Sequence, residues 1–322
     1  MAEAPGNDVR MNLTTIIRKY LKTRGKVVCS EKQYDTMEKF IMSLLAADVT
    51  AGCDVSSILF SKDRALQLHA FLGSYVDNVS NRGTMHVLFK ASTKRHEQSY
   101  DELKVMFSGE NVIFHAETDF RSQLVGLCED SPAGKIMFYV DDMIFTHQLD
   151  YDAVRLVDSS RYILSLTRGK DLTYSLVYQK PLSLPAFYDK VHGFECFRWD
   201  ETEEFSDWSF PLGVSGYLFG RQETLAMLKT IEFRAPNSLE AGLQNFLPFF
   251  RGRFGLCTDR AVCTCVPANL VQSEWSNLHL GTFTVDELLS VWEQGNMIDR
   301  REFYGKPMDV TQTQRYTFID RR

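Results

Sequence analysis

The sequence lacks any apolar run that approaches the roughly 18–20 residues needed to span a bilayer, and its first residues lack the apolar segment of a secretory signal. We therefore expect a cytoplasmic protein without a transmembrane segment. Cysteine is scarce, at 7 of 322 residues, and the one cluster, Cys257, Cys263 and Cys265, lacks the paired spacing of a zinc site. We expect these cysteines to be reduced, buried thiols.

An excess of basic residues is also absent. The chain has 36 Lys and Arg against 42 Asp and Glu, a formal charge of −6, which argues against a general nucleic-acid binder. It has neither a GxGxxG motif nor a Walker-type glycine run, which excludes a dinucleotide fingerprint and a P-loop. What the chain does have is 44 % hydrophobic residues, enough for a sizeable core.

Residues 1–54 form a predicted helical extension. Basic side chains surround a few apolar ones over 10–26, which predicts a basic amphipathic helix. Ser30 and Gln33 then form a capping box, and apolar residues at helical spacing follow over 34–45. We expect both helices to pack on the domain behind them, as a structural or oligomerising appendage. Peripheral contact of the basic helix with an anionic membrane surface is a hypothesis.

From residue 55 short apolar runs alternate with helical segments. The expected strands are 57–60, 86–89, 111–114 and 135–140, and the expected helices are 63–79, 100–107 and 120–128. This alternation predicts an α/β fold with a mostly parallel sheet flanked by helices, because parallel neighbours need crossover connections. Further on, strands are expected at 161–167 and 174–178. A helix is expected at 222–229. A second helix is expected from residue 237, with Asn237 as its cap and Glu240 in its first turn, and a third is expected after a capping box at 284–287.

Charged residues follow two of the predicted strands. Asp141 and Asp142 end the strand at 135–140, and Lys62, Asp63 and Arg64 end the first strand. Open α/β sheets bind ligands at the carboxyl ends of their strands. Two carboxylates there suit Mg²⁺ or Mn²⁺ that also binds phosphate oxygens. At the end of the first strand, the aspartate can accept from a nucleobase or a ribose, and the lysine or arginine can lie near a phosphate. A helix cap or a charged turn would give the same pattern.

Several segments, all in one order, resemble glycosyltransferases of the GT-A fold. They are SILFSKDRALQLHAFLGSY at 57–75, FYVDDMIF at 138–145, YILSLTRG at 162–169, SDWSFPLGVSGYLFGR at 206–221, PNSLE at 236–240, VPANLVQ at 266–272 and ELLSVWEQGNMID at 287–299. The resemblance covers about residues 55–300. It implies a GT-A-like, Rossmann-like domain over 55–322, with a nucleotide-binding half at about 55–145 and an acceptor-side half at about 146–322.

The resemblance implies metal-dependent transfer of a hexose or pentose from a nucleoside diphosphate sugar, UDP- or GDP-linked, to a hydroxyl of a glycan, lipid-linked or protein-linked acceptor. The residues that it assigns to the donor nucleotide are Phe60, Ser61, Lys62, Asp63, Arg64, Asp119, Arg121 and Asp141. Asp141 and Asp142 would hold Mn²⁺ or Mg²⁺, with His279 as a third contact. The metal would offset the charge that develops on the leaving diphosphate.

On the acceptor side, an inverting transferase needs a base to take the proton of the attacking hydroxyl. Glu240 is the first candidate and Asp207 the second; retaining chemistry would need no such base. Trp208, Ser215 and Tyr217 are expected on this side, because flat rings suit the C–H faces of sugars. Ser215 stands where the family pattern has an acid, which indicates a different sugar or weakened activity.

Three alternatives stay open. A sugar nucleotidyltransferase would usually show a glycine-rich basic loop after the first strand, and FSKDRALQ has no glycine. A catalytically silent carbohydrate-binding or scaffold protein would fit the Ser215 departure. A glycoside hydrolase fits less well, because the adjacent Asp141 and Asp142 point apart and cannot readily flank a glycosidic bond at about 5–9 Å.

Overall fold

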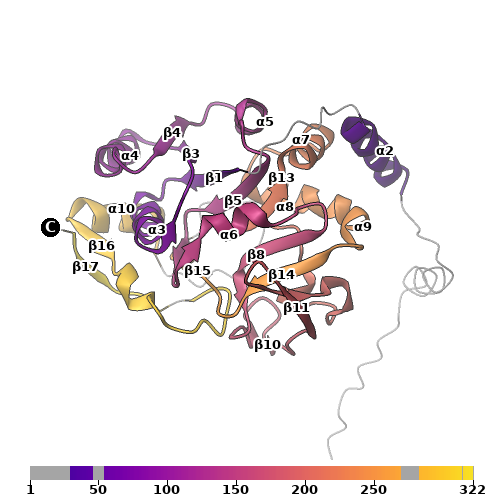
Figure 1. Ribbon diagram of the computed structural model, residues 1–322. Helices are drawn as coiled ribbons and strands as arrows, with labels where there is room; N and C mark the ends of the chain where they lie inside the picture. The colour runs from indigo at the N-terminus through magenta and orange to yellow at the C-terminus, as the bar shows by residue number, and fades with distance from the viewer. Residues whose placement is uncertain (1–29, 46–53, 270–282, 314, 322) are drawn as a thin grey trace, which may run out of the picture.

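The computed structural model describes residues 30–45, 54–269, 283–313 and 315–321 (Figure 1). The predicted basic helix at 10–26 and His279 lie outside the described residues. Within these ranges, no helix is long and apolar enough to cross a membrane. The five cysteines described, Cys257, Cys263 and Cys265 among them, are buried free thiols, as expected.

A nine-stranded sheet organises the chain, in the order β11-β12-β14-β8-β13-β5-β1-β3-β4. Its strands are β1 (Val55–Lys62), β3 (Met85–Lys90), β4 (Val112–Ala116), β5 (Lys135–Val140), β8 (Tyr162–Gly169), β11 (Phe187–Val191), β12 (Phe194–Phe197), β13 (Tyr217–Gly220) and β14 (Phe254–Thr258). Only β12 and β13 run against the other seven strands of this sheet. The predicted α/β fold with a mostly parallel sheet is therefore confirmed.

Helices cover both faces of the sheet (Figure 1). One face carries α3 (Ala65–Asn78), α4 (Lys94–Met106), α6 (Tyr151–Leu156) and α10 (Val285–Glu293), and the other carries α5 (Phe120–Asp130), α7 (Arg221–Thr230), α8 (Pro236–Leu243) and α9 (Leu247–Phe250). Successive side chains of a strand point to opposite faces. Accordingly Leu59 packs into the first core, and Ile58 and Phe60 pack into the second. The first strand is buried from Val55 to Ser61 because both of its faces are covered.

Short elements complete the chain. They are the strands β2 (Val79–Ser80), β6 (Met143–Phe145), β7 (Leu149–Asp150), β9 (Tyr174–Ser175), β10 (Lys180–Pro181), β15 (Cys263–Cys265), β16 (Asn296–Ile298) and β17 (Phe318–Asp320), and the 3₁₀ turns η1 (Trp199–Glu201), η2 (Asp207–Ser209), η3 (Gln244–Phe246) and η4 (Arg300–Phe303). The strand expected at 174–178 is therefore only two residues long.

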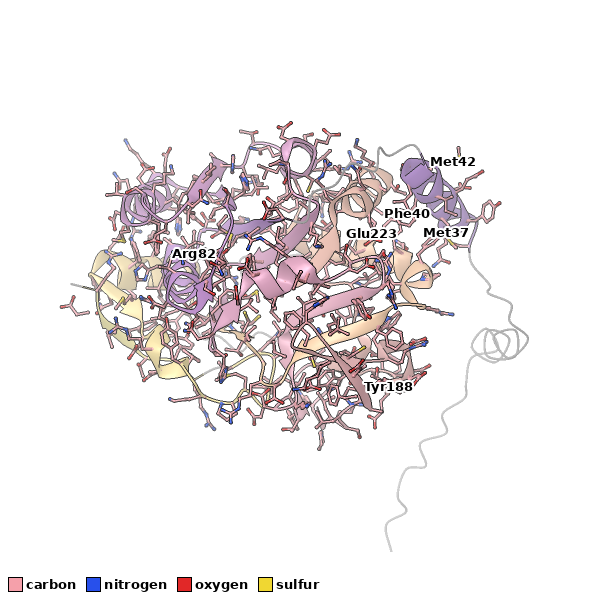
Figure 2. The ribbon with its side chains drawn as sticks, viewed as in Figure 1. Met37, Phe40, Met42, Arg82, Tyr188 and Glu223 are labelled. Carbon is pink, nitrogen blue, oxygen red and sulfur yellow. The ribbon has the colours of Figure 1, made fainter. Side chains whose placement is uncertain are left out.

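The helix α2 (Glu31–Leu45) belongs to the predicted extension and packs against the second core. Its capping box is present: the Ser30 N–H donates to Gln33 Oε1 at 2.9 Å, and the Gln33 N–H donates to Ser30 Oγ at 3.2 Å. Phe40 contacts the rings of Phe246 and Phe249, at 4.8 and 4.9 Å between centroids, whereas Met42 lies on the outer side (Figure 2). The expected packing of this helix is confirmed, and the domain boundary at residue 54 stays a prediction.

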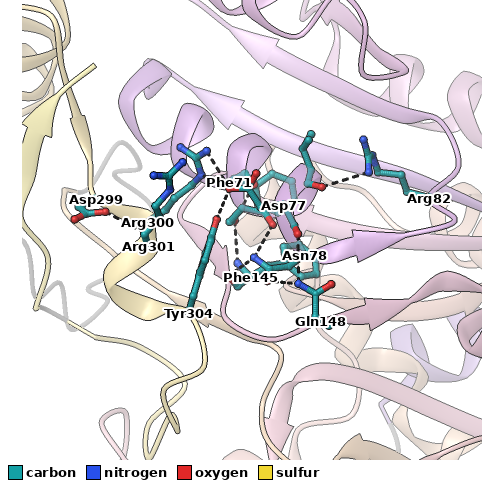
Figure 3. A network of polar contacts seen from close by, with 12 residues as sticks. Phe71, Asp77, Asn78, Arg82, Phe145, Gln148, Asp299, Arg300, Arg301 and Tyr304 are labelled. Carbon is teal, nitrogen blue, oxygen red and sulfur yellow. Dashed lines mark hydrogen bonds and ion pairs between the residues drawn. The ribbon is translucent and has the colours of Figure 1, made fainter. Parts of the chain in front are cut away.

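The C-terminal segment from Arg300 onward is bonded to α3. Arg300 and Tyr304 both point to Asp77 (Figure 3), with Arg300 Nη2 at 3.0 Å and the Tyr304 hydroxyl at 2.7 Å from Asp77 Oδ2. The Arg300 guanidinium lies so close to Gly73 that a Cβ there would come within 2.6 Å of it. Glycine therefore allows this approach. The fastened segment then runs back to the carboxyl edge of the sheet, where Thr311 and Gln312 reach the cavity described next.

Candidate functional site

A cavity of about 760 Å³ opens along the carboxyl ends of β1, β3 and β5. Its walls come from the β1 and β5 ends, from α8, and from the C-terminal segment. The side chains that line it include Phe60, Ser61, Lys62, Arg64, Asp141, Asp142, Asp207, Ser215, Tyr217, Glu240 and Thr311. The structure thus brings together most of the residues that the sequence singled out, at the predicted edge of the sheet.

Arg64 binds both acidic residues that follow β5. Its Nη1 lies 3.0 Å from Asp141 Oδ1 and 3.3 Å from Asp142 Oδ2, and Ser61 Oγ donates to Asp141 Oδ2 at 2.8 Å. Burial raises the pKa of Asp141 to about 6, against the opposing effect of Arg64 and with a smaller upward push from Asp142. Arg64 also donates to Asn269, through Nε to Oδ1 at 2.9 Å and through Nη2 to the carbonyl. This acid–arginine cluster is therefore rigidly placed.

The cluster leaves limited room for a metal ion. Both oxygens of Asp141 accept hydrogen bonds, whereas Asp142 Oδ1 accepts none from the described residues, and the Asp142 side chain is 16 % exposed. No three His, Cys, Asp or Glu side chains gather for a metal within the described ranges. Mg²⁺ is commonly held by one or two carboxylates plus water and substrate phosphates. The residues present fit such a metal through Asp142.

Lysines at two strand ends face the same cavity. Lys62 and Lys90 are register partners at the ends of β1 and β3, and Lys90 pairs with Glu117 at 2.9 Å. Phe60, Leu88 and Phe120 add apolar lining beside them. Lys90 and Glu117 were not predicted, although both follow predicted strands and the strand-end rule points to such positions.

Asp63 does not reach the cavity, which corrects the donor role that the resemblance implied. Its carboxylate accepts from the Ser92 N–H and the Ser92 hydroxyl, both at 2.6 Å. Its backbone is left-handed, with φ of 55°. Aspartate tolerates this conformation better than most residues because its short side chain bonds locally. Asp63 therefore ties the β1–α3 turn to the turn that follows β3.

We expect Asp63→Ala to lower the free energy of unfolding by about 2–4 kcal/mol, because two hydrogen bonds to a carboxylate are lost and alanine is strained in a left-handed turn. Asp63→Asn keeps an acceptor and tolerates the backbone, so its loss should be less than half as large. Urea unfolding of the two variants measures this difference. Equal losses would show that the side-chain bonds to Ser92 contribute little.

Asp119 and Arg121 do not line the cavity, although their neighbours Glu117 and Phe120 do, so the structure does not bring them into the donor site that the resemblance implied. Asp119 caps α5 by accepting from the Ser122 N–H at 2.6 Å, and this bonding lowers its pKa. Arg121 donates to the carbonyls of Leu228, Lys229 and Ile231 at the end of α7. Both side chains hold helices in place.

Glu240 enters the cavity from the second turn of α8. The helix begins at Pro236 with Ala235 as its cap, so the expected cap Asn237 lies inside it. The Val214 N–H donates to Glu240 Oε1 at 3.1 Å. Burial raises the pKa of Glu240, and this N–H and the nearby Arg168 oppose the shift. Cys265 lines the same cavity as Asp142 and Glu240, and burial, followed by smaller effects of Asp142, Cys263 and Glu240, raises the pKa of its thiol.

Arg168 is a buried residue of the cavity wall that the sequence did not reveal. Its Nη1 donates to Ser165 Oγ at 2.7 Å and to the Tyr217 hydroxyl, and its Nη2 donates to the Phe210 carbonyl at 2.9 Å and to the Asp207 carbonyl. It thereby fixes the turn that carries Asp207. Asp207 Oδ1 accepts from Thr311 Oγ1 at 3.1 Å, and its buried Oδ2 has no partner in the described part of the chain.

The aromatic residues around Trp208 divide between core and cavity. Trp208 is 1 % exposed and meets Phe197 edge to face, at 5.1 Å between centroids. A ring so buried cannot stack on a sugar, so the predicted acceptor contact of Trp208 is wrong. Tyr217 and Ser215 do line the cavity, although the Tyr217 hydroxyl is engaged by Arg168 and by the Phe210 carbonyl at 2.7 Å.

Comparisons with known proteins support a similarity to a glycosyltransferase. No family model matches the chain. The chain is 24 % identical over 180 residues to the bifunctional glycosyltransferase pgtA of Dictyostelium discoideum, which covers 50 % of this chain and 23 % of that protein. The resemblance to glycosyltransferases is confirmed by this match. The chain therefore spans about a quarter of the length of the curated relative that it matches.

Solved structures of TarS from S. aureus also match part of this chain. One matches with a TM-score of 0.42 and 11 % identity, over 67 % of this chain and 37 % of that chain. TarS 1–349 in complex with UDP matches with a TM-score of 0.43 and 12 % identity, over 67 % of this chain and 61 % of that chain.

Proposed function

We propose that this chain transfers a sugar from a nucleoside diphosphate donor, UDP- or GDP-linked, to a hydroxyl of a carbohydrate acceptor. One observation carries the proposal: a single cavity joins the acid–arginine cluster of Arg64, Asp141 and Asp142 to Glu240, a carboxylate on another element. The sequence match to a glycosyltransferase supports the same class of reaction.

The donor would lie along the carboxyl edge of the sheet, with its diphosphate beside Asp142 and Lys62. Asp142, assisted by Asp141, would hold Mn²⁺ or Mg²⁺. Such an ion would offset the charge on the leaving diphosphate. Adjacent strands are about 4.8 Å apart, so β3 lies about 10 Å from β5, a span that suits the nucleoside. Phe60, Leu88 and Phe120 offer apolar surface there.

Glu240 would act as the base. It would take the proton of the acceptor hydroxyl while that oxygen bonds to the anomeric carbon and the bond from that carbon to the phosphate oxygen breaks. A raised pKa makes the Glu240 carboxylate a stronger base than an exposed glutamate. The Val214 N–H holds one of its oxygens, which orients the other. Asp207, in the same cavity, is the second candidate.

The test is a thermal-shift panel of UDP, GDP, dTDP and CMP, each with and without Mn²⁺. A ligand at about 100 times its dissociation constant adds about 2.7 kcal/mol, which should raise the melting temperature by about 5 °C. We expect one nucleotide to stabilise the wild type only with Mn²⁺, and Asp142→Asn to lose this shift. Asp150→Asn is the matched control, because Asp150 caps α6 outside the cavity and asparagine caps equally well.

Two other outcomes of the thermal-shift panel would change the proposal. Stabilisation without Mn²⁺ that survives in Asp142→Asn would remove the metal from the proposal and leave the donor site standing. If no nucleotide stabilises the protein, the donor site is absent and the silent carbohydrate-binding alternative replaces the transferase.

A further inference from the structure

Two aromatic rings project at the mouth of the cavity. Tyr178 is 40 % exposed and Phe205 is 70 % exposed, and their rings meet edge to face with centroids 6.1 Å apart. Val177 and Tyr178 line the cavity, and so does Ser206, the residue after Phe205. The pair is therefore continuous with the space that holds Asp207 and Glu240.

The backbone presents the Phe205 ring under strain. Phe205 has φ of 57°, in the left-handed region that is costly for a residue with a bulky side chain. The next residue, Ser206, caps η2 by a reciprocal pair of bonds with Ser209, which fixes the chain immediately after the strained position. A large apolar ring is thus held in solvent in a costly conformation, and residues held so cluster at ligand sites.

We infer that Tyr178 and Phe205 form a platform that binds a neutral oligosaccharide acceptor and leads its terminal hydroxyl into the cavity. The inference rests on the proposed function and names the acceptor class of the same site. Flat rings with an apolar face suit the C–H faces of sugars. Burial and the neighbouring Asp207 carboxylate raise the pKa of Tyr178, in keeping with a platform that lies beside the acids of the cavity.

The charge around the platform selects among possible occupants. The segment before Phe205 carries Asp200, Glu201, Glu203 and Glu204. Two cations offset them in part: Arg198 lies 2.8 Å from Asp200, and the Lys180 ammonium lies 3.4 Å from Glu203, so the acids remain in excess. This acidic border disfavours an acidic glycan or an anionic lipid surface, whereas it leaves a neutral sugar chain unaffected. Two rings also offer far less area than the roughly 1,000 Å² of a stable protein interface. A neutral oligosaccharide is the occupant that fits.

The experiment measures oligosaccharide binding by saturation-transfer NMR in the presence of UDP or GDP with Mn²⁺. The neutral probes are maltohexaose, mannohexaose and fully N-acetylated chitohexaose. A hyaluronan hexasaccharide is the acidic probe. The variants are Phe205→Gly, which removes the ring and suits the left-handed backbone, and Tyr178→Ala. Tyr188→Ala is the matched control: Tyr188 is 57 % exposed in the same part of the chain (Figure 2) but does not line the cavity.

We expect at least one neutral hexasaccharide to bind and the acidic one to bind more weakly. Each ring removed should weaken neutral binding by roughly 3- to 10-fold, with nucleotide binding unchanged and Tyr188→Ala equal to wild type. Undiminished oligosaccharide binding by the double variant Tyr178→Ala, Phe205→Gly would overturn the inference. A preference for the acidic hexasaccharide would also overturn it. So would a wild-type protein that binds nucleotide but none of the oligosaccharides. Loss of nucleotide binding by the wild type itself would instead contradict the proposed function.

Discussion

Replacing Glu240 by glutamine is expected to lower the rate of sugar transfer by about 10²–10⁴-fold, the range for loss of a general base, with nucleotide binding within about twofold of wild type. The residue lies on α8 and is bonded to the Val214 N–H and not to the acid–arginine cluster, so the donor site should survive the change. Glutamine keeps the oxygen that accepts from the Val214 N–H, so the fold around it should persist. Initial rates with a saturating donor measure the effect.

The pH dependence gives a second reading of the same variant. A base works in its ionised form, so transfer should fall as the pH drops through the pKa of Glu240. Burial raises that pKa above its ordinary value of 4.5. The acid limb of the wild-type rate profile should therefore have its midpoint above 4.5. The residual activity of Glu240→Gln should lack this limb, since no carboxylate remains to titrate there.

Two further variants make the assignment specific. Glu223→Gln is the matched control: Glu223 (Figure 2) is also largely covered, with a side chain 12 % exposed, and burial raises its pKa, but it pairs with Arg253 and does not line the cavity. It should lose stability and keep its rate per folded molecule. Asp207→Asn tests the second candidate. A normal rate in Glu240→Gln together with a large loss in Asp207→Asn would assign the base to Asp207.

The sheet and its functional edge were predictable because both depend on local patterns. The apolar strand Lys135–Val140 has the bounds that the sequence indicated, and its end at Asp141 and Asp142 places the acids at the cavity. The prediction for α8 was less accurate, because asparagine is a good cap by propensity, whereas Pro236 takes the first helical position. Element boundaries depend on such single-residue competition.

The individual roles were less predictable because they depend on long-range packing. Trp208 and Phe205 are neighbours in the sequence, yet one is buried against Phe197 and the other is exposed at the cavity mouth. No local pattern separates them. Arg168 is the one charged residue of its strand, Tyr162–Gly169. Thr311 reaches the cavity through bonds to distant parts of the chain, since the Cys265 N–H donates to its carbonyl at 2.9 Å and its hydroxyl donates to Asp207.

Replacing Arg64 by methionine should lower the free energy of unfolding by about 3–5 kcal/mol near pH 8, because it leaves two acidic residues at one strand end without their cation. Asp141 is only 3 % exposed, and Asn269 also loses the two Arg64 groups that donate to it, although the Gln67 amide still donates to its Oδ1 at 2.9 Å. Arg64→Lys keeps a charge but not the fork that reaches Asn269, so it should lie between wild type and Arg64→Met. Urea unfolding measures all three proteins.

The sign of the pH dependence distinguishes this account from a simple packing defect. Folding raises the pKa of a buried carboxyl when ionisation of that carboxyl destabilises the folded state. This destabilisation is absent below the pKa of the unfolded chain, about 3.9, and it is complete above the pKa of the folded protein. In the wild type that window ends at about 6. Arg64 lowers the pKa of Asp141, so its loss extends the window upward. The deficit of Arg64→Met should therefore shrink as the pH falls.

A matched arginine shows how much of the deficit belongs to the cluster. Arg82, labelled in Figure 3, pairs with Glu110, but both side chains are partly exposed, so Arg82→Met should cost about 1 kcal/mol and change little with pH. A deficit in Arg64→Met that is the same at pH 5 and pH 8 would mean that Asp141 does not carry an uncompensated charge in the folded state. Arg64 would then stabilise the turn through Asn269 alone, and the acids would be free to bind a metal without competition from its guanidinium.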